Sequence, residues 1–216
     1  MKSDADLQKD VMAELKYEPR VNSAHINVES RNGAIKLTGN VNTYPERNYA
    51  VVAAKRVAGV KAVTDEIEVK LSKQDNRSDS DITTAATNAL KWHANIPEDR
   101  IKIAVEKGRV TLDGEVDWQY QRTQAESAIR YLRGVISLGN RIKVKPTNKP
   151  DEVKSQIEAA FRRQARNEAD RVNILAAGAK VTLTGELDTL AHSEEIERAA
   201  WSAPGVKEVE NRITVL

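Results

Sequence analysis

Three histidines, His25, His93 and His192, are the side chains in this sequence best suited to acid–base catalysis near neutral pH. The chain has no cysteine, which excludes disulfides, thiolate metal sites and a cysteine nucleophile. The sequence contains no metal-binding HExxH pattern, no GxSxG nucleophile elbow and no glycine-rich phosphate loop. Its many carboxylates are scattered over helix faces. We therefore expect no catalytic residue, no metal site and no cofactor.

Composition narrows the class of protein. The 216 residues include 34 Lys and Arg against 32 Asp and Glu, and 40% are hydrophobic. These values fit a soluble globular protein, and no run reaches the roughly 18 apolar residues that span a bilayer. The first ten residues, MKSDADLQKD, place acids where a secretory signal has an apolar region, so we expect a cytoplasmic protein. The alternative is a periplasmic protein whose export signal has been removed.

The elements that must position any site recur three times. Residues 4–71 can be aligned with residues 79–146 without a gap, at an offset of 75, and a third copy follows at a further offset of 71. The same Leu-x-Gly mark ends at Gly39, Gly114 and Gly185. Short polar segments separate the copies. We therefore expect three domains, unit one (1–71), unit two (79–146) and unit three (150–216). Domains of this size bury only a small core, so we expect contacts between the units to stabilise them.

Each copy has the same pattern of apolar residues. A stripe of apolar residues four apart, such as Leu7, Val11 and Leu15, indicates a helix. Two alternating runs joined by a glycine turn indicate a hairpin, and the Leu-x-Gly glycines would allow a bend or close helix packing after its second strand. An alanine-rich helix and a last alternating strand follow. The fold class is α+β: three tandem αββαβ modules, each a three-stranded mixed sheet with two helices on one face.

The repeats also test for catalysis, because a site built into the module should recur at equivalent positions. His25 aligns with Arg100 and Arg171. His93 aligns with Glu18 and Gln164, and His192 aligns with Glu46 and Gln121. No histidine recurs, so we expect a protein that is not an enzyme.

The order of elements, the Leu-x-Gly mark, the Gly-Val after the second helix and the final strand together resemble the BON domain family (bacterial OsmY and nodulation). The copies read LTGNV…AAKRVAGVKAVTDEIEV, LDGEV…ESAIRYLRGVISLGNRIKV and LTGEL…ERAAWSAPGVKEVENRITV. The resemblance covers nearly the whole chain. It implies a small αββαβ module of osmotic-shock proteins, secretins and mechanosensitive channels that binds phospholipid surfaces. The chain lacks a LysM-like tail, so the resemblance does not extend to cytoplasmic BON–LysM potassium sensors.

Unit two is the most basic unit, with 11 basic and 9 acidic residues. Three of its cations are expected to share the exposed face of one strand, since they alternate with Ile142 and Val144, and others lie on the second helix beside two aromatic residues. The candidate lipid-surface site is Trp118, Tyr120, Arg122, Arg130, Arg133, Arg141, Lys143 and Lys145. The alternative is that Trp118 caps the helix or packs between units while the cations only keep the chain soluble. Trp92 and Trp201 are expected to pack on core or inter-unit surfaces.

Two functions compete at this point. The first is peripheral association with an anionic phospholipid surface, in an osmotic or envelope stress role. The second is a scaffold of three modules that docks partner proteins. Nucleic-acid binding is not expected, because the sequence has no basic run, no GxxG clamp and no surface aromatic pair on a strand. The sequence does not indicate the oligomeric state, the partner or a bound ion.

Overall fold

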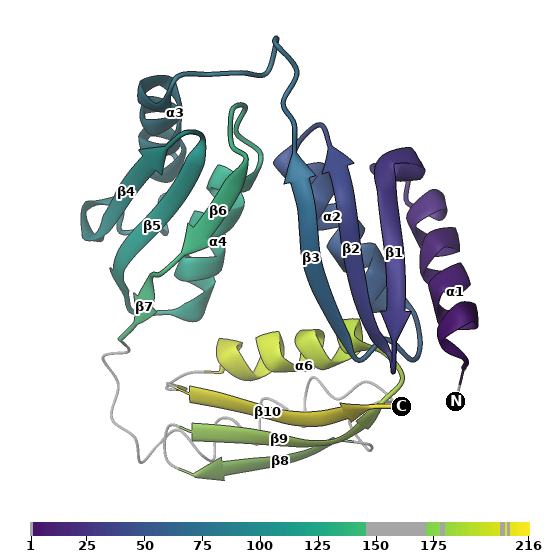
Figure 1. The fold of residues 1–216 in the computed structure, drawn as a ribbon. Coiled ribbons are helices and arrows are strands. Elements are labelled where there is room, and N and C mark those ends of the chain that lie inside the picture. Colours follow the sequence, from purple (N-terminus) through teal and green to yellow (C-terminus); the bar gives the residue numbers. More distant parts are fainter. Residues whose placement is uncertain (1, 146–171, 178–179, 204–205, 207) are drawn as a thin grey trace.

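The computed structural model describes residues 2–145, 172–177, 180–203, 206 and 208–216. In unit one, the helix α1 (Asp4–Tyr17) and a 3-10 turn (Ser23–His25) precede the hairpin strands β1 (Ile26–Arg31) and β2 (Ala34–Val41). The helix α2 (Tyr44–Arg56) and the strand β3 (Ala62–Val69) complete the unit (Figure 1).

The other two units follow the same order within the described residues. Unit two consists of α3 (Asp79–Lys91), a 3-10 turn (Glu98–Arg100), β4 (Ile101–Glu106), β5 (Arg109–Val116), α4 (Gln119–Arg130), β6 (Ser137–Asn140) and β7 (Lys143–Val144). Unit three contains β8 (Val172–Ala177), β9 (Lys180–Leu187), α6 (Leu190–Ser202) and β10 (Glu208–Val215). The first helix expected in unit three falls at residues 150–171, outside the described residues.

All three sheets have the same mixed topology. The hairpin strands pair antiparallel, and the strand after the second helix pairs parallel with the second hairpin strand, which is therefore central. The register repeats too: Gly39 lies opposite Ile26, Gly114 opposite Ile101 and Gly185 opposite Val172. The predicted α+β class with tandem αββαβ modules is confirmed.

In units one and two, both helices pack on one face of the sheet because their apolar residues recur at helical spacing. In α1, Leu7, Val11 and Leu15 are at most 3% exposed, and in α2 the residues Ala50 and Ala53 are fully buried. Alanine at these positions allows the second helix to approach the strands closely. Side-chain oxygens of Ser3 and Thr43 accept amides at the helix N-termini, which fixes where α1 and α2 begin.

The Leu-x-Gly glycines hold a close contact between strands. Gly39 has φ +116°, and a Cβ added to it would lie 2.0 Å from the His25 carbonyl oxygen. A Cβ on Gly114 would lie 2.1 Å from the Arg100 carbonyl oxygen. The prediction of close helix packing was wrong, because backbone atoms of the neighbouring segment are the nearest contacts of both glycines. These glycines lie inside the second strand, and they meet the backbone that leads into the first strand.

The last strand of unit two is interrupted, although the sequence predicts one continuous strand. β6 ends at Asn140 and β7 begins at Lys143, although the Arg141 amide still donates to the Leu112 carbonyl of β5 at 2.8 Å. The register is the same on both sides of the break, as Leu112 pairs with Asn140 and Val116 with Val144. The predicted alternation therefore holds: Arg141, Lys143 and Lys145 are exposed and Ile142 is buried.

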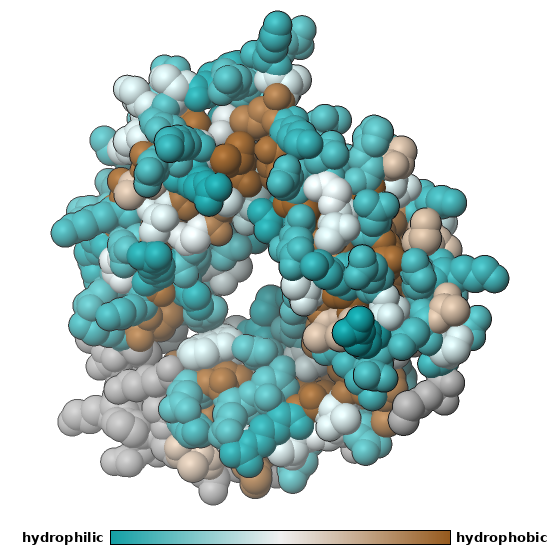
Figure 2. All heavy atoms as spheres, in the orientation of Figure 1, coloured by the Kyte–Doolittle hydropathy of each residue, from teal (hydrophilic) through white to brown (hydrophobic). Residues whose placement is uncertain are grey.

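The three units surround a common centre (Figure 1). The helix α2 of unit one contacts both other units, because Tyr44 packs against the core of unit two and Lys55 pairs with Glu194 of unit three. An opening remains between the three units in the space-filling view (Figure 2). Unit one therefore contacts both other units through its second helix, and α4 of unit two also contacts α6 of unit three.

Candidate functional site

Trp92 projects from the end of α3 with 88% of its surface exposed. The prediction that Trp92 packs on a core or inter-unit surface was wrong. The buried stripe of α3 runs through Ile82, Ala86 and Leu90, and two further residues turn the chain by about 200°, so position 92 faces away from the sheet. Trp201 behaves as predicted, since it is half-buried against the core of unit three.

The exposed aromatic residue recurs in unit one. Tyr17 is 83% exposed and occupies the position equivalent to Trp92, at the end of α1. A lysine precedes each of them, Lys16 in α1 and Lys91 in α3. The sequence contained the information to predict this pair. The offset of 75 aligns Tyr17 with Trp92, and both positions lie out of phase with the buried residues of their helices.

Hydrogen bonds bring three segments of unit two to the same end of the module as Trp92. The Gln121 side-chain amide near the start of α4 donates to the Asn95 carbonyl, in the loop after α3, at 3.2 Å. The Lys145 amide donates to the Val116 carbonyl at 2.7 Å, which holds the segment after β7 beside the end of β5. We call this set of residues the Trp92 end: Lys91, Trp92, Trp118, Tyr120, Lys143 and Lys145.

Trp118 is half-buried and stands immediately before α4. Its backbone amide, like that of Asp117, donates to the Gln121 side-chain oxygen at 3.1 Å. An indole has no acceptor for a helix amide, so Trp118 cannot cap the helix with its side chain as Thr43 and Thr189 do at equivalent positions. Tyr120, one residue into α4, is 47% exposed.

The three strand cations share their face of the sheet with carboxylates of the central strand. Glu115 is the register partner of Lys143, and its carboxylate forms an ion pair with the Lys145 ammonium. Asp113 lies on the same exposed face, two residues earlier on β5. The last strand alone suggested a strongly positive face, but the neighbouring strand partly neutralises it.

The three predicted arginines of α4 and its C-terminus do not join the Trp92 end. Arg122 donates to the Asn140 carbonyl at 3.4 Å, and Arg130 pairs with Glu126 at 2.5 Å. Both side chains are half-buried on the helix. Arg133 lies beyond the opposite end of α4, with its Nε 3.9 Å from the carboxylate of Asp75 in the linker. The eight residues of the predicted site are thus divided among separate surfaces.

One polar feature recurs in all three units and was not anticipated. The side chains of Asp65, Asn140 and Asn211 each accept the backbone amide two residues further on, at 3.0, 3.2 and 3.1 Å. Each also bonds to the second helix of its unit, as Arg47 does with Asp65 at 2.7 Å. The offsets of 75 and 71 mark these positions in the sequence. Their partners are internal, so the feature fastens helix to sheet rather than forming a binding site.

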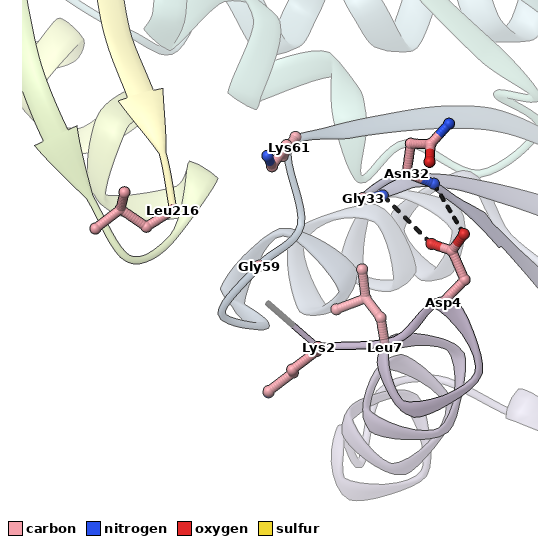
Figure 3. Close-up of a pocket in the computed structure, with 8 residues that line it drawn as sticks. All are labelled: Lys2, Asp4, Leu7, Asn32, Gly33, Gly59, Lys61 and Leu216. Atoms are coloured by element: carbon pink, nitrogen blue, oxygen red, sulfur yellow. Dashed lines mark hydrogen bonds between the residues drawn. The ribbon is translucent and has the colours of Figure 1, made fainter.

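A pocket of about 280 Å³ lies between unit one and the end of unit three (Figure 3). Its walls include Lys2, Leu7 and Lys61 of unit one and Leu216 of unit three. The Asp4 carboxylate at its rim accepts the amides of Asn32 and Gly33, at 3.0 and 3.4 Å. The Asn32 amide, followed by the Ser30 hydroxyl, holds the pKa of Asp4 below its usual value. The Asp4 carboxylate therefore holds the start of α1 against the hairpin turn through these hydrogen bonds.

The histidines lie on three different kinds of element. His25 ends a 3-10 turn and His93 follows α3, both exposed, whereas the His192 amide donates to the Thr189 hydroxyl at 3.2 Å inside α6. Within the described parts of the chain, no group of three or more His, Asp or Glu side chains could hold a metal ion. No helix in those parts is long and apolar enough to cross a membrane. The absence of enzymatic activity stays a prediction.

Comparison with known proteins finds the same repeat. The model of the BON domain matches residues 3–70, 78–146 and 150–216. The chain is 30% identical over 146 residues to the osmotically-inducible protein Y of Escherichia coli (strain K12). The aligned region covers 66% of this chain and 73% of that protein.

Two solved structures are similar at low sequence identity. The C-terminal domain of CdsD, a structural protein of the type III secretion system of Chlamydia trachomatis, has 14% identity and a TM-score of 0.27, with both chains fully covered. The PrgH periplasmic domain has 11% identity and a TM-score of 0.24, covering 88% of this chain and 95% of that one. Such low TM-scores carry no argument about fold or function.

Proposed function

The chain belongs to the BON domain family, with three tandem copies of the domain, and from this premise we propose that it is a non-enzymatic protein that associates peripherally with anionic phospholipid surfaces. The contact is made through the Trp92 end of unit two. The role is in osmotic stress, a proposal supported by the name of the osmotically-inducible relative. The cytoplasmic location and its periplasmic alternative both stay predictions.

The observation that carries the proposal is the exposure of Trp92 directly after Lys91, at the end of unit two where Lys143 and Lys145 also lie. Trp92 is 88% exposed, and a large apolar ring held in water gains free energy when it enters a lipid interface. Lys91 precedes it, and Lys143 and Lys145 lie at the same end of unit two, on the face of the sheet opposite the helices. Each such cation is worth about 1 kcal/mol near an anionic membrane surface. The ion pair between Lys145 and Glu115 reduces this contribution at one of the three positions.

Unit one supplies a matched control. Tyr17 has almost the same exposure as Trp92 at the equivalent position, and Lys16 precedes it as Lys91 precedes Trp92. Its last strand differs, because Glu68 and Lys70 stand where unit two has Lys143 and Lys145. We therefore expect the corresponding end of unit one to attract anionic lipid less.

Flotation with liposomes tests the proposal. The wild-type chain should float with vesicles of phosphatidylglycerol and phosphatidylcholine but not with phosphatidylcholine alone. Trp92→Ala and the double variant Lys143→Gln/Lys145→Gln should each reduce flotation, whereas Tyr17→Ala should not. If Tyr17→Ala and Trp92→Ala behave alike, the assignment to unit two is wrong. If the wild-type chain does not float with anionic vesicles, lipid association is wrong and the scaffold of three protein-docking modules replaces it.

A further inference from the structure

Unit one meets the other two units along two seams that differ in chemistry, and α4 of unit two also contacts α6 of unit three. Seam one–two joins α2 of unit one to α4 and β6 of unit two. Tyr44 at the start of α2 packs against the core of unit two, and the Tyr49 hydroxyl donates to the Tyr131 hydroxyl at 3.2 Å. A pocket of about 210 Å³ lies beside Tyr44, lined by both units. This seam therefore contains a half-buried aromatic anchor.

Seam one–three joins α2 to α6 of unit three, and polar contacts lie at the C-terminal part of α2. The Lys55 ammonium forms an ion pair with the Glu194 carboxylate of α6. The Gly59 amide donates to the Asp188 carbonyl at 3.4 Å. In the described parts of the chain, the apolar core clusters of units one and three share no side chain. The pocket of Figure 3 opens along the same boundary, with Lys61 on one wall and Leu216 on the other.

Water and mobile ions still reach the ion pair, since the side chains of Lys55 and Glu194 are 23% and 36% exposed. It is also specific to this seam. The positions equivalent to Glu194 are Asn48 and Thr123, so neither of the other units offers a carboxylate there. Unit three carries 9 basic and 12 acidic residues over 151–216 while unit one carries 11 and 10, so their net charges also attract weakly.

We propose that seam one–three is an ionic latch, which holds unit three on α2 at low ionic strength and releases it at high ionic strength, while units one and two stay paired. Mobile ions screen the attraction between Lys55 and Glu194, because the Debye length falls from about 10 Å at 0.1 M salt to about 3 Å at 1 M. The apolar packing of the Tyr44 ring against the core of unit two is not weakened by screening. Salt should therefore weaken seam one–three and leave seam one–two unchanged.

This latch does not rest on the proposed lipid function, and it is measured without lipid. Because the chain has no cysteine, pairs of cysteines can be introduced and labelled for energy transfer. Asn27 in unit one, Lys102 in unit two and Glu186 in unit three are exposed strand positions suitable for substitution by Cys. The Asn27/Glu186 pair reports seam one–three, and the Asn27/Lys102 pair reports seam one–two.

Raising KCl from about 0.05 M to about 1 M should lower energy transfer across seam one–three and leave seam one–two unchanged. Sorbitol of equal osmolality, which adds no ions, should leave both unchanged. Glu194→Lys should lower transfer across seam one–three even at low salt, and Lys55→Glu in the same chain should restore it. In the double-mutant cycle of these two substitutions, we expect a coupling of about fivefold in the ratio of docked to undocked chains.

Glu195→Lys is the matched control, because it makes the same charge change at the next residue of α6, which is exposed. It should leave transfer across seam one–three near the wild-type value. The proposal is overturned if transfer across seam one–three does not change with KCl, or if Glu194→Lys and Glu195→Lys have equal effects. Release by sorbitol as well as KCl would also contradict it, since an osmotic rather than ionic response would then operate.

Discussion

The hydroxyl of Tyr49 donates to the hydroxyl of Tyr131, 3.2 Å away, across the boundary between two copies of the same repeated module. Tyr49 lies in the second helix of unit one, and Tyr131 follows the second helix of unit two. The Arg20 guanidinium lies over the Tyr49 ring, 3.9 Å from its centroid, in a cation–π contact. Repetition of one module therefore produced a specific contact between copies as well as three similar cores.

Tyr44→Ala should weaken the coupling between units one and two. Tyr44 is half-buried against the core of unit two, and burial raises the pKa of its hydroxyl. Removing the ring should lower the free energy of unfolding by about 2 kcal/mol, because its apolar contacts with unit two are lost. Urea unfolding followed by circular dichroism measures this change. Tyr17→Ala, which removes an exposed ring, should cost less than about 0.5 kcal/mol, and an equal cost in both variants would contradict the packing of Tyr44.

Glu18 makes the stability of unit one depend on pH. Its side chain is 4% exposed, and Arg20 and Arg56 donate to it at 2.6 and 3.2 Å. The hydrogen bond from Arg20 is the largest cause that lowers the pKa of Glu18 from 4.5 to about 2. Because the folded pKa is the lower one, the stabilisation is fully present above pH 4.5 and is lost as the pH falls toward 2.

Glu18→Gln isolates this contribution. The variant should unfold at a lower urea concentration than the wild-type chain near neutral pH, and the difference should shrink as the pH falls from about 4.5 toward about 2. Urea titrations monitored by circular dichroism at several pH values give the comparison. A difference that stays constant over this range would mean that the Glu18 carboxylate does not stabilise the fold through its charge.

Gly39→Ala should be strongly destabilising. A methyl group at this position would lie 2.0 Å from the His25 carbonyl oxygen, at a φ of +116° that L residues rarely adopt. We expect a loss of more than about 2 kcal/mol, measured as a shift in thermal or urea unfolding. Gly139→Ala in β6 is the control, since the atom nearest to its added Cβ is 3.8 Å away. Equal tolerance of both substitutions would contradict the close contact at Gly39.

Local periodicity and the offsets between copies were sufficient to predict the modules. The buried stripe of Leu7, Val11 and Leu15 and the alternation around Ile142 reflect burial on one face, which a linear pattern records directly. The register of the glycine contact was not predictable in this way. Gly39 meets the His25 carbonyl across the ladder, and only the pairing of β1 with β2 determines which backbone atoms face each other.

The candidate site was less predictable because it depends on neighbours distant in sequence. Counting cations along one strand did not include Glu115, which the central strand places beside Lys145. Arg130 was grouped with the surface cations, yet Glu126 pairs with it one turn earlier on the same helix. Trp92 could have been found, since position 92 is out of phase with the stripe ending at Leu90. The seams were not predictable, as Lys55 and Glu194 are joined only by the arrangement of the units.

The most direct measurement of the central claim is the fluorescence of Trp92 in the Trp118→Phe/Trp201→Phe variant, where it is the only tryptophan left of three. On addition of phosphatidylglycerol vesicles, its emission should shift to shorter wavelength and be quenched by brominated acyl chains, because the exposed ring enters the interface. Phosphatidylcholine vesicles should cause neither change. Emission that stays at the wavelength of a water-exposed indole in phosphatidylglycerol vesicles, in a variant shown by flotation to bind them, would contradict lipid contact through the Trp92 end of unit two.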